Sequence, residues 1–166
     1  MSSEKLLVVL RHAKSSWEET DKTDFDRALK GKGIEDIQLL ASKLKKKLGT
    51  IDVIYSSPAN RAIHTAIRFA QIVGFPLSGI RIEEGLYEAH EKYVEEFVKS
   101  LPDDLQCVMI VGHNPTSTDF VNVFLSERIE NLPTAGLVML RFSMSSWSEI
   151  SSSSLTSFYL DFPKNH

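Results

Sequence analysis

The sequence holds a single cysteine, Cys107, among its 166 residues. One thiol cannot pair within the chain, so a disulfide-stabilised scaffold is excluded, and the apolar run around Cys107 predicts that it is buried. Long hydrophobic runs are also lacking, because no stretch approaches the roughly 18 to 20 apolar residues that span a bilayer. The apolar residues 6–10 end at Arg11 and are too few for a signal peptide. These absences predict a soluble, cytoplasmic protein.

The chain also lacks an excess of charge of one sign. Its 19 Lys and Arg residues and 22 Asp and Glu residues give a formal net charge of -3 at pH 7. Nucleic acids and acidic membrane surfaces are polyanions, and they are bound by strongly basic proteins. We therefore expect neither a nucleic acid nor a membrane as partner.

The motifs of common cofactor and metal sites are missing. The sequence has no Walker phosphate loop, no G-x-G-x-x-G turn and no G-x-S-x-G nucleophile elbow. Its histidines and its cysteine form no H-x-x-x-H or C-x-x-C pair of the kind that binds metal ions. The sequence therefore predicts chemistry without a cofactor and without a metal.

What is present has the composition of an ordinary globular chain, with 42% hydrophobic and 25% charged residues, and we expect one domain over residues 1–166. Short β-branched apolar runs alternate with apolar stripes at helical spacing. This pattern is typical of a three-layer α/β/α sandwich around a mostly parallel, mixed sheet. The predicted strands are residues 6–10, 51–55, 80–84, 108–111, 137–142 and, as an edge, 156–162. The predicted helices are residues 34–48, 59–73, 92–101 and 115–125.

Polar side chains directly follow four of the predicted strands. Arg11 and His12 follow the first strand, and Arg61 lies in the opening turn of the helix after the second. Glu88 and His113 come after the next two strands. Because ligands in open α/β sheets bind beyond the carboxyl ends of the strands, we expect these five side chains to meet at one rim.

The predicted rim combines two arginines with the amino end of a helix, and this combination predicts a dianion as the ligand. A guanidinium is a permanently charged fork of donors that matches phosphate oxygens, and the amino end of a helix also favours anions. A charge pair at about 4 Å contributes of order 4 kcal/mol, before desolvation, at an effective dielectric of about 20. The same guanidinium groups would repel a divalent metal ion. We therefore predict that the rim binds a phosphoryl group.

His12 beside these arginines suits nucleophilic catalysis. Neighbouring positive charge lowers the pKa of an imidazole below its ordinary value of about 6.5, so an empty pocket would hold His12 neutral. A neutral imidazole has a lone pair that can attack phosphorus, and covalent catalysis divides a hydrolysis into two easier steps. Arg11, Arg61 and His113 would stabilise the charge that spreads over the phosphoryl oxygens in the transition state.

The motifs around these residues resemble those of the histidine phosphatase superfamily, which includes phosphoglycerate mutases and acid phosphatases. RHAKSSW at 11–17 resembles its R-H-G/A opening, SSPANRAIHTA at 56–66 its S-S-P-x-x-R-A-x-x-T-A element, and GHNP at 112–115 its second-histidine motif. Together with DFDRALKGKG at 24–33, they are most similar to the short phosphohistidine phosphatases of the SixA type. The likeness extends from about residue 5 to residue 162.

The resemblance implies a phosphoglycerate mutase-like fold and a set of roles. His12 would be the phosphorylated nucleophile, and Arg11, Arg61 and His113 would form the phosphate pocket around it. Glu88 falls where many relatives carry their general acid, and an ordinary solvated side chain is the alternative.

Arg27 has two interpretations. In the D-x-D-R stretch it would bind the phosphorylated substrate, and alternatively it only neutralises Asp24 and Asp26 beside it. Ala28 stands where the family usually has proline.

Three functions are consistent with the sequence. The first is a phosphatase that hydrolyses phosphohistidine on protein substrates through a covalent phosphohistidine on His12. The resemblance implies that mutases of the superfamily place an inserted lid over their small substrates. In this chain, about 24 residues separate Glu88 from His113. They are enough for one short helix and one strand, so we expect no such lid here. An open pocket would admit the side chain of a phosphorylated protein. The second function is a phosphatase of small phosphoesters or phosphoramidates, and the third is a non-catalytic module that docks phosphorylated partners.

Overall fold

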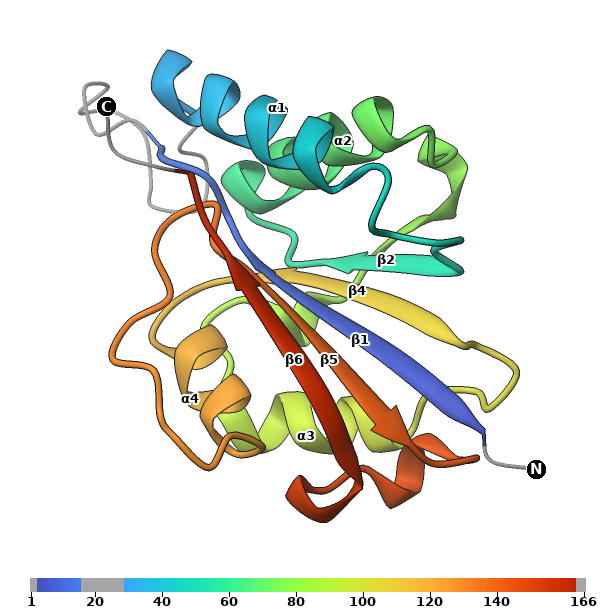
Figure 1. Ribbon diagram of the computed structural model, residues 1–166. Coiled ribbons are helices and arrows are strands. Elements are labelled where there is room, and N and C mark those ends of the chain that lie inside the picture. The colour runs from blue at the N-terminus through green and yellow to red at the C-terminus, as the bar shows by residue number, and fades with distance from the viewer. Residues whose placement is uncertain (1–2, 16–28, 164–166) are drawn as a thin grey trace.

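The computed structural model of the protein describes residues 3–15 and 29–163 (Figure 1). Within these residues, six strands form one sheet in the order β3-β2-β4-β1-β5-β6. Neighbouring strands from β3 to β1 are parallel, and β5 runs antiparallel to both β1 and β6. The mostly parallel, mixed sheet that the sequence predicts is confirmed. The strands are β1 Glu4–Arg11, β2 Val53–Ser56, β3 Ile80–Ile82, β4 Cys107–Gly112, β5 Leu137–Ser143 and β6 Leu155–Asp161.

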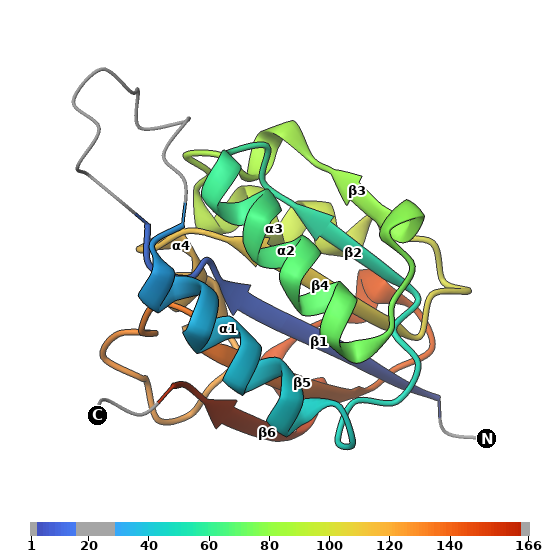
Figure 2. The same cartoon turned by 90° about the horizontal axis from the view of Figure 1, so that it is seen from above.

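Helices cover both faces of the sheet and complete the three-layer sandwich (Figures 1 and 2). α1 and α2 lie side by side on one face, and α3 and α4 lie on the other. In the part of the chain that the structure describes, no helix is long and apolar enough to cross a membrane. The helices are α1 Gly31–Leu44, α2 Asn60–Val73, α3 Glu91–Lys99 and α4 Thr116–Asn122.

The central strand β1 is apolar on both of its faces. Leu6, Val8 and Leu10 belong to the core under α1 and α2, whereas Leu7 and Val9 belong to the core under α3 and α4. Successive side chains of a strand point to opposite faces of the sheet, so a strand between two helix layers has no polar face along its length. The polar side chains of β1 therefore lie at its two ends, with Lys5 near the amino end and Arg11 at the carboxyl end.

α1 is shifted from its predicted position. It begins at Gly31 rather than at residue 34, and it ends at Leu44 rather than at residue 48. Residues 45–47 form a turn in which the Leu48 N–H still donates to the Leu44 carbonyl at 2.9 Å. Leu48 is buried, as its place on the apolar stripe predicts. The chain must reverse here to enter β2, and the turn achieves this while keeping Leu48 in the core.

α4 is shorter than predicted, ending at Asn122 rather than at residue 125. The Asn122 side chain accepts the Ile129 N–H at 2.8 Å and donates to the Ile129 carbonyl at 2.9 Å. These bonds fasten the following loop beside the helix end, where three further residues would otherwise extend the helix. Pro115 stands at the N-cap position of α4, one residue before the helix begins, and Oδ1 of Asn114 accepts the Thr118 N–H at 3.2 Å.

The remaining elements lie close to their predicted positions. α2 ends before Gly74, whose φ of 81° is the left-handed conformation expected of a glycine helix stop. β6 is an edge strand, and the serine cluster before it forms a short turn at Ser152–Ser154. β3 covers only part of the predicted residues 80–84.

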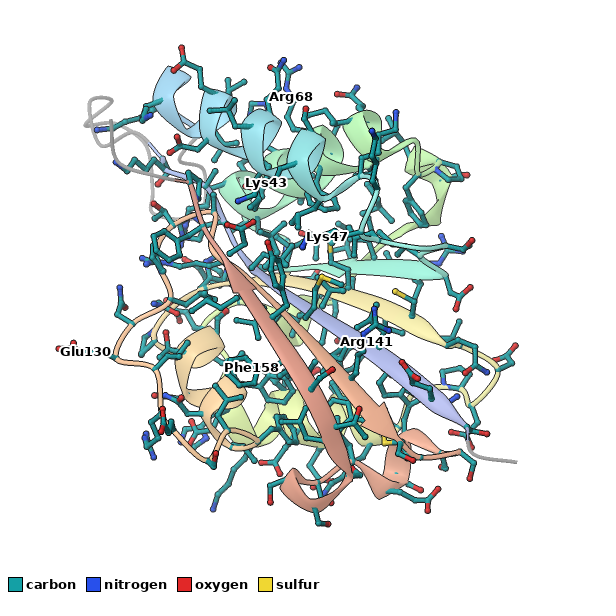
Figure 3. All side chains as sticks on the ribbon, in the orientation of Figure 1. Lys43, Lys47, Arg68, Glu130, Arg141 and Phe158 are labelled. Atoms are coloured by element: carbon teal, nitrogen blue, oxygen red, sulfur yellow. The ribbon has the colours of Figure 1, made fainter. Side chains whose placement is uncertain are left out.

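An ion pair joins α1 to β6. Lys43 extends from α1 (Figure 3), and its Nζ lies 3.1 Å from Oδ2 of Asp161. The same carboxylate accepts the Tyr159 hydroxyl at 2.9 Å and the Phe162 N–H at 2.8 Å. Burial alone would raise the pKa of Asp161, but the hydrogen bonds from Tyr159, Lys43 and Phe162 outweigh it and hold the pKa below its ordinary value.

We predict that Asp161→Asn lowers the free energy of unfolding near pH 7 by about 1 kcal/mol, because the side chain of its partner Lys43 is 54% exposed and water screens the ion pair. The pKa of Asp161 is lower in the folded than in the unfolded chain. Its contribution is therefore present above the unfolded pKa of about 3.9 and is lost as the pH falls through the folded pKa. Urea unfolding near pH 7 and near pH 3 should show the difference between the two proteins shrinking in acid.

An equal difference at both pH values would contradict this account of Asp161. Asp104→Asn is the matched control, since Asp104 is an exposed carboxylate in a turn. This control should keep the pH dependence of the parent protein.

Candidate active site

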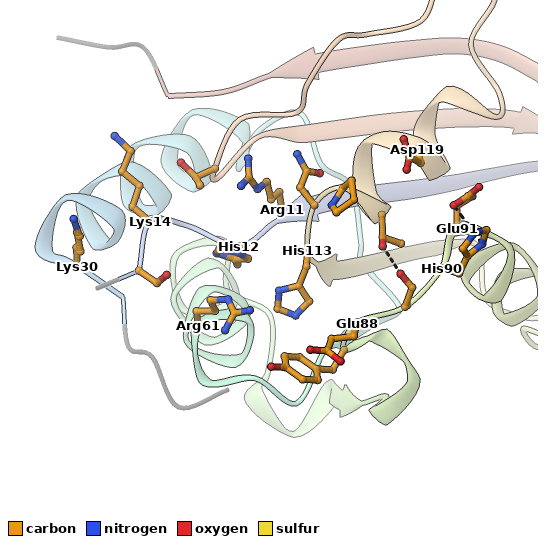
Figure 4. Close-up of a pocket in the computed structure, with 17 residues that line it drawn as sticks. Arg11, His12, Lys14, Lys30, Arg61, Glu88, His90, Glu91, His113 and Asp119 are labelled. Atoms are coloured by element: carbon orange, nitrogen blue, oxygen red, sulfur yellow. Dashed lines mark hydrogen bonds and ion pairs between the residues drawn. The ribbon is translucent and has the colours of Figure 1, made fainter. Parts of the chain in front are cut away.

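A pocket of about 800 Å³ opens where β1, β2 and β4 end (Figure 4). This is the edge at which parallel α/β sheets bind their ligands. Six separate segments of the chain contribute to its lining. The structure brings together in its lining the predicted site residues Arg11, His12, Arg61, Glu88 and His113.

His12 is held by its main chain and by its ring. Its N–H donates to the Gly112 carbonyl at 3.0 Å, and its carbonyl accepts the Ala135 N–H at 3.1 Å. The ring Nδ1 lies 2.7 Å from the carbonyl oxygen of Ala13. Because a carbonyl oxygen can only accept, Nδ1 carries the proton, and the lone pair of the neutral ring is on Nε2. The side chain is 7% exposed, so little reorganisation is open to it.

The loop after His12 is clamped between α1 and α2. The Ala13 N–H donates to Oγ1 of Thr65 at 3.0 Å, and the Thr65 hydroxyl donates to the Arg61 carbonyl at 2.7 Å. On the other side, the Lys14 carbonyl accepts the Lys30 N–H at 2.9 Å. The Ala13 carbonyl that orients the His12 ring therefore belongs to a fixed segment of main chain.

His113 follows β4 and faces the same pocket as His12. The centroids of the two rings are 5.2 Å apart and their planes are inclined at 56°. Nε2 of His113 lies 2.7 Å from Oγ of Ser57, and that oxygen also accepts the Ala59 N–H at 3.3 Å. The loop after β2 thus holds the ring of His113 beside His12.

Arg11 ends β1 and is anchored by main-chain oxygen. Its Nη1 donates to the Leu132 carbonyl at 2.9 Å, and its own N–H donates to the Gly136 carbonyl at 2.9 Å. Burial lowers the pKa of the guanidinium below its ordinary value. A cation that has lost hydration in this way gains from a nearby anion.

Arg61 lies in the first turn of α2 and is 5% exposed. Its guanidinium carbon is 6.0 Å from the centre of the Tyr87 ring. The Tyr87 ring also meets His113 in an edge-to-face contact, with centroids 5.6 Å apart. Tyr87 therefore packs against two of the predicted phosphate-binding side chains, and its ring stabilises the cation through its quadrupole.

Glu88 lies at the mouth of the pocket and is exposed. Its φ of 55° is left-handed, a conformation that costs a residue with a side chain about 1–2 kcal/mol. Next to it, the Ala89 carbonyl accepts the hydroxyl of Thr116, which fastens this loop to the start of α4. Glu88 is therefore held at the pocket edge by its loop, with its carboxyl in contact with solvent.

Two lysines that the sequence did not suggest, Lys14 and Lys30, also line the pocket. The predicted contact of Arg27 with the substrate lies outside the described residues. In residues 3–15 and 29–163, no group of three His, Cys, Asp or Glu side chains has the arrangement of a metal site.

Residues 7–105 match the histidine phosphatase superfamily (branch 1). The chain belongs to the histidine phosphatase superfamily. An uncharacterized protein of Mycobacterium tuberculosis is 30% identical over 151 residues, which cover 85% of this chain and 91% of that protein. Membership of the superfamily supports phosphatase activity.

Solved structures of the superfamily share the fold. A protein from Agrobacterium tumefaciens named as a SixA phosphohistidine phosphatase is 28% identical, with a TM-score of 0.72 over 82% of this chain and 90% of that one. A protein of the same name from Nakamurella multipartitia has a TM-score of 0.81 at 19% identity, with 97% of each chain covered. Phosphoglycerate mutase from Bacillus anthracis has a TM-score of 0.64 at 16% identity, over 89% of this chain and 95% of that one. The phosphoglycerate mutase-like fold that the resemblance implied is confirmed.

Ser57, Thr65 and Tyr87 build the site, although reasoning from the sequence gave them no role. Ser57 and Thr65 stand in the superfamily motif around Arg61, and Tyr87 precedes Glu88. The sequence could have indicated them only through their spacing along the chain from the predicted site residues Arg61 and Glu88. Their contacts with His113, Ala13 and Arg61 depend on how separate loops pack, which no single motif contains.

We predict that Gly33→Ala lowers both stability and any turnover at this site. A Cβ on Gly33 would lie 2.2 Å from the carbonyl oxygen and 2.9 Å from the nitrogen of Lys14. In a helix, alanine is favoured over glycine by about 1 kcal/mol. The clash of the new Cβ with the main chain of Lys14 opposes this gain, because it must displace the loop after His12 at a cost of about 1–3 kcal/mol. Thermal unfolding and turnover of the variant test this.

Gly31→Ala is the matched control on the same helix, because a Cβ there meets nothing within 4 Å. It should leave stability and turnover unchanged or slightly raise stability. Equal behaviour of the two variants would show that the approach of Lys14 to Gly33 is unimportant.

Proposed function

We propose that the protein is a phosphatase that hydrolyses phosphohistidine on protein substrates through a covalent phosphohistidine on His12. The observation that carries this proposal is the 2.7 Å contact between Nδ1 of His12 and the Ala13 carbonyl. It fixes the tautomer in which Nε2 holds the lone pair, in a pocket that Arg11 and Arg61 also line. A neutral nitrogen nucleophile beside two permanent cations is suited to attack on a phosphoryl dianion.

In the first step, the lone pair of His12 Nε2 forms a bond to phosphorus as the P–N bond of the substrate breaks. The leaving imidazole keeps the electron pair of that bond and takes up a proton. In the second step, water attacks phosphorus, the bond to Nε2 breaks, and the lone pair returns to His12 as phosphate leaves. The proton lost by the attacking water goes to a base at the pocket edge or to solvent.

In this proposal, Arg11, Arg61 and His113 bind the non-bridging oxygens of the phosphoryl group. Charge spreads over these oxygens in the transition state, and fixed donors stabilise it without reorganising. Arg61 is buried and Arg11 is half-buried, which strengthens each interaction because less water screens it than at the surface.

Glu88 is the proposed proton donor and acceptor. Its exposed carboxyl at the mouth of the pocket can exchange protons with solvent between the two steps. An imidazole leaves phosphorus more easily than an alkoxide does. Protonation of the leaving group by a general acid is therefore less important here than in the hydrolysis of a phosphoester.

Two observations support a protein as the substrate. The chain between Glu88 and His113 forms α3 and β4, which belong to the sandwich itself. Structures with this fold from Agrobacterium tumefaciens and Nakamurella multipartitia carry the name of phosphohistidine phosphatases. A phosphorylated side chain carried by another protein would enter the pocket from its open side.

We predict that His12→Ala abolishes turnover while the fold is retained, because the nucleophile is lost and the surrounding main-chain bonds are not. Incubation of the parent protein with a ³²P-labelled phosphohistidine protein should yield an acid-labile adduct, and His12→Ala should yield none. Circular dichroism checks the fold of the variant. Turnover by His12→Ala would reject the covalent mechanism, and stable binding of the labelled protein without an adduct would favour the docking module.

A substrate panel separates the phosphatase alternatives. We predict that kcat/KM for a phosphorylated histidine carrier protein exceeds that for sugar phosphates, nucleotides and free phosphoramidate. A docked protein gains binding contacts around the pocket that small substrates lack, and such contacts lower the barrier. A higher kcat/KM for a small phosphoester or for phosphoramidate would overturn the protein substrate and leave the phosphatase chemistry in place.

A further inference from the structure

The carbonyl oxygen of Leu132 accepts two side-chain donors from different parts of the chain. Nη1 of Arg11 lies 2.9 Å from it, and Nδ2 of Asn114 lies 3.0 Å from it. Leu132 belongs to the loop that leads into β5, and its side chain is fully buried. One main-chain oxygen therefore connects the arginine after β1 with the asparagine after β4.

The amide of Asn114 has a partner for each of its four hydrogen-bonding positions. Nδ2 donates to Oδ1 of Asn131 at 2.8 Å and to the Leu132 carbonyl at 3.0 Å. Oδ1 accepts the N–H of Thr118 at 3.2 Å and its hydroxyl at 2.9 Å. An amide with two donors and two acceptor lone pairs in use can adopt only one orientation.

Thr118 completes this hydrogen-bond network and lies outside the pocket lining. Its hydroxyl donates to Asn114 and accepts the Leu132 N–H at 3.0 Å, so it fixes both the amide and the loop that carries the shared carbonyl. Thr118 is buried in α4 and does not line the pocket. Its effect on a bound phosphoryl group would have to pass through Asn114 and Leu132.

We propose that Thr118 and Asn114 are positioning residues, which hold the Leu132 carbonyl where it aims the Arg11 guanidinium at the phosphoryl group. This inference rests on the proposed function and extends it to Thr118, which lies outside the pocket lining, and to Asn114 within it. Among the described residues, Nε of Arg11 has no hydrogen-bond partner, and the bond from Nη1 to the Leu132 carbonyl anchors the guanidinium. A guanidinium with one anchor follows any displacement of that anchor.

The test removes the Thr118 hydroxyl. Thr118→Val keeps the shape of the side chain and deletes one donor to Asn114 and one acceptor for Leu132. We expect kcat to fall by about tenfold to a hundredfold, the scale of small misplacements at catalytic sites. KM should change less, because the arginine stabilises charge that develops in the transition state. Thr118→Ser, which restores the hydroxyl, should recover most of the activity.

Ser117→Ala is the control on the same helix, since Ser117 is also buried and lies outside the pocket lining. It should leave kcat near that of the parent. In an Arg11→Gln background, Thr118→Val should have almost no further effect, because the group that it positions is gone. An effect of equal size in both backgrounds, or equal losses for Thr118→Val and Ser117→Ala, would overturn the proposal.

Orthovanadate titration by calorimetry makes the inference testable apart from turnover. Thr118→Val should weaken vanadate binding, and Thr118→Ser should not. The parent protein could bind vanadate and yet hydrolyse none of the substrates in the panel. The proposed function would then fail, but the titration would still test whether Thr118 positions Arg11. Unchanged vanadate affinity in Thr118→Val would overturn that role. Thr118→Ala replaces Thr118→Val in every arm if the valine variant does not fold.

Discussion

The hydrogen bond from Nδ1 of His12 to the Ala13 carbonyl is the interaction on which the candidate site depends. An imidazole without this bond could present either nitrogen to the pocket. The bond in turn requires a fixed Ala13 main chain, which Thr65 provides from α2. It also requires the close approach of Lys14 to α1, which only a glycine at position 33 allows. The direction of one lone pair is thus set by packing between two helices and a loop.

Sheet topology explains why distant motifs form one site. β1 lies between β4 and β5, and β4 lies between β1 and β2, so the strands that precede His12, His113 and Arg61 are adjacent. All three run in the same direction, and their following loops emerge at one edge. The apolar requirement on both faces of β1 leaves its two ends for polar residues, and the carboxyl end is the one that opens into the pocket. Fold and site are therefore two consequences of the same two-sided burial.

The sequence predicted the layers, the strands and five of the residues that line the pocket, because each depends on a pattern of neighbouring residues in the chain. Two-sided burial appears in the unbroken apolar runs, and the superfamily motifs place Arg61 and His113. The ends of α1 and α4 were predicted wrongly, because a turn at residues 45–47 and the bonds of Asn122 to Ile129 arise from the path of the chain. The contacts of Ser57, Tyr87 and Thr118 could not be predicted, because each joins segments that only the packed structure brings together.

The kind of atom that orients Arg11 matters for what the pocket can bind. A carboxylate would fix a guanidinium and also neutralise it, so that an incoming phosphoryl group would compete with a charge already in place. The carbonyl of Leu132 supplies direction through a dipole and leaves the positive charge available. The same holds for the His12 ring, which the Ala13 carbonyl orients without adding negative charge that would favour the imidazolium. In the proposed mechanism, orientation by main-chain oxygen therefore keeps the arginine attractive to a dianion and the histidine able to act as a nucleophile.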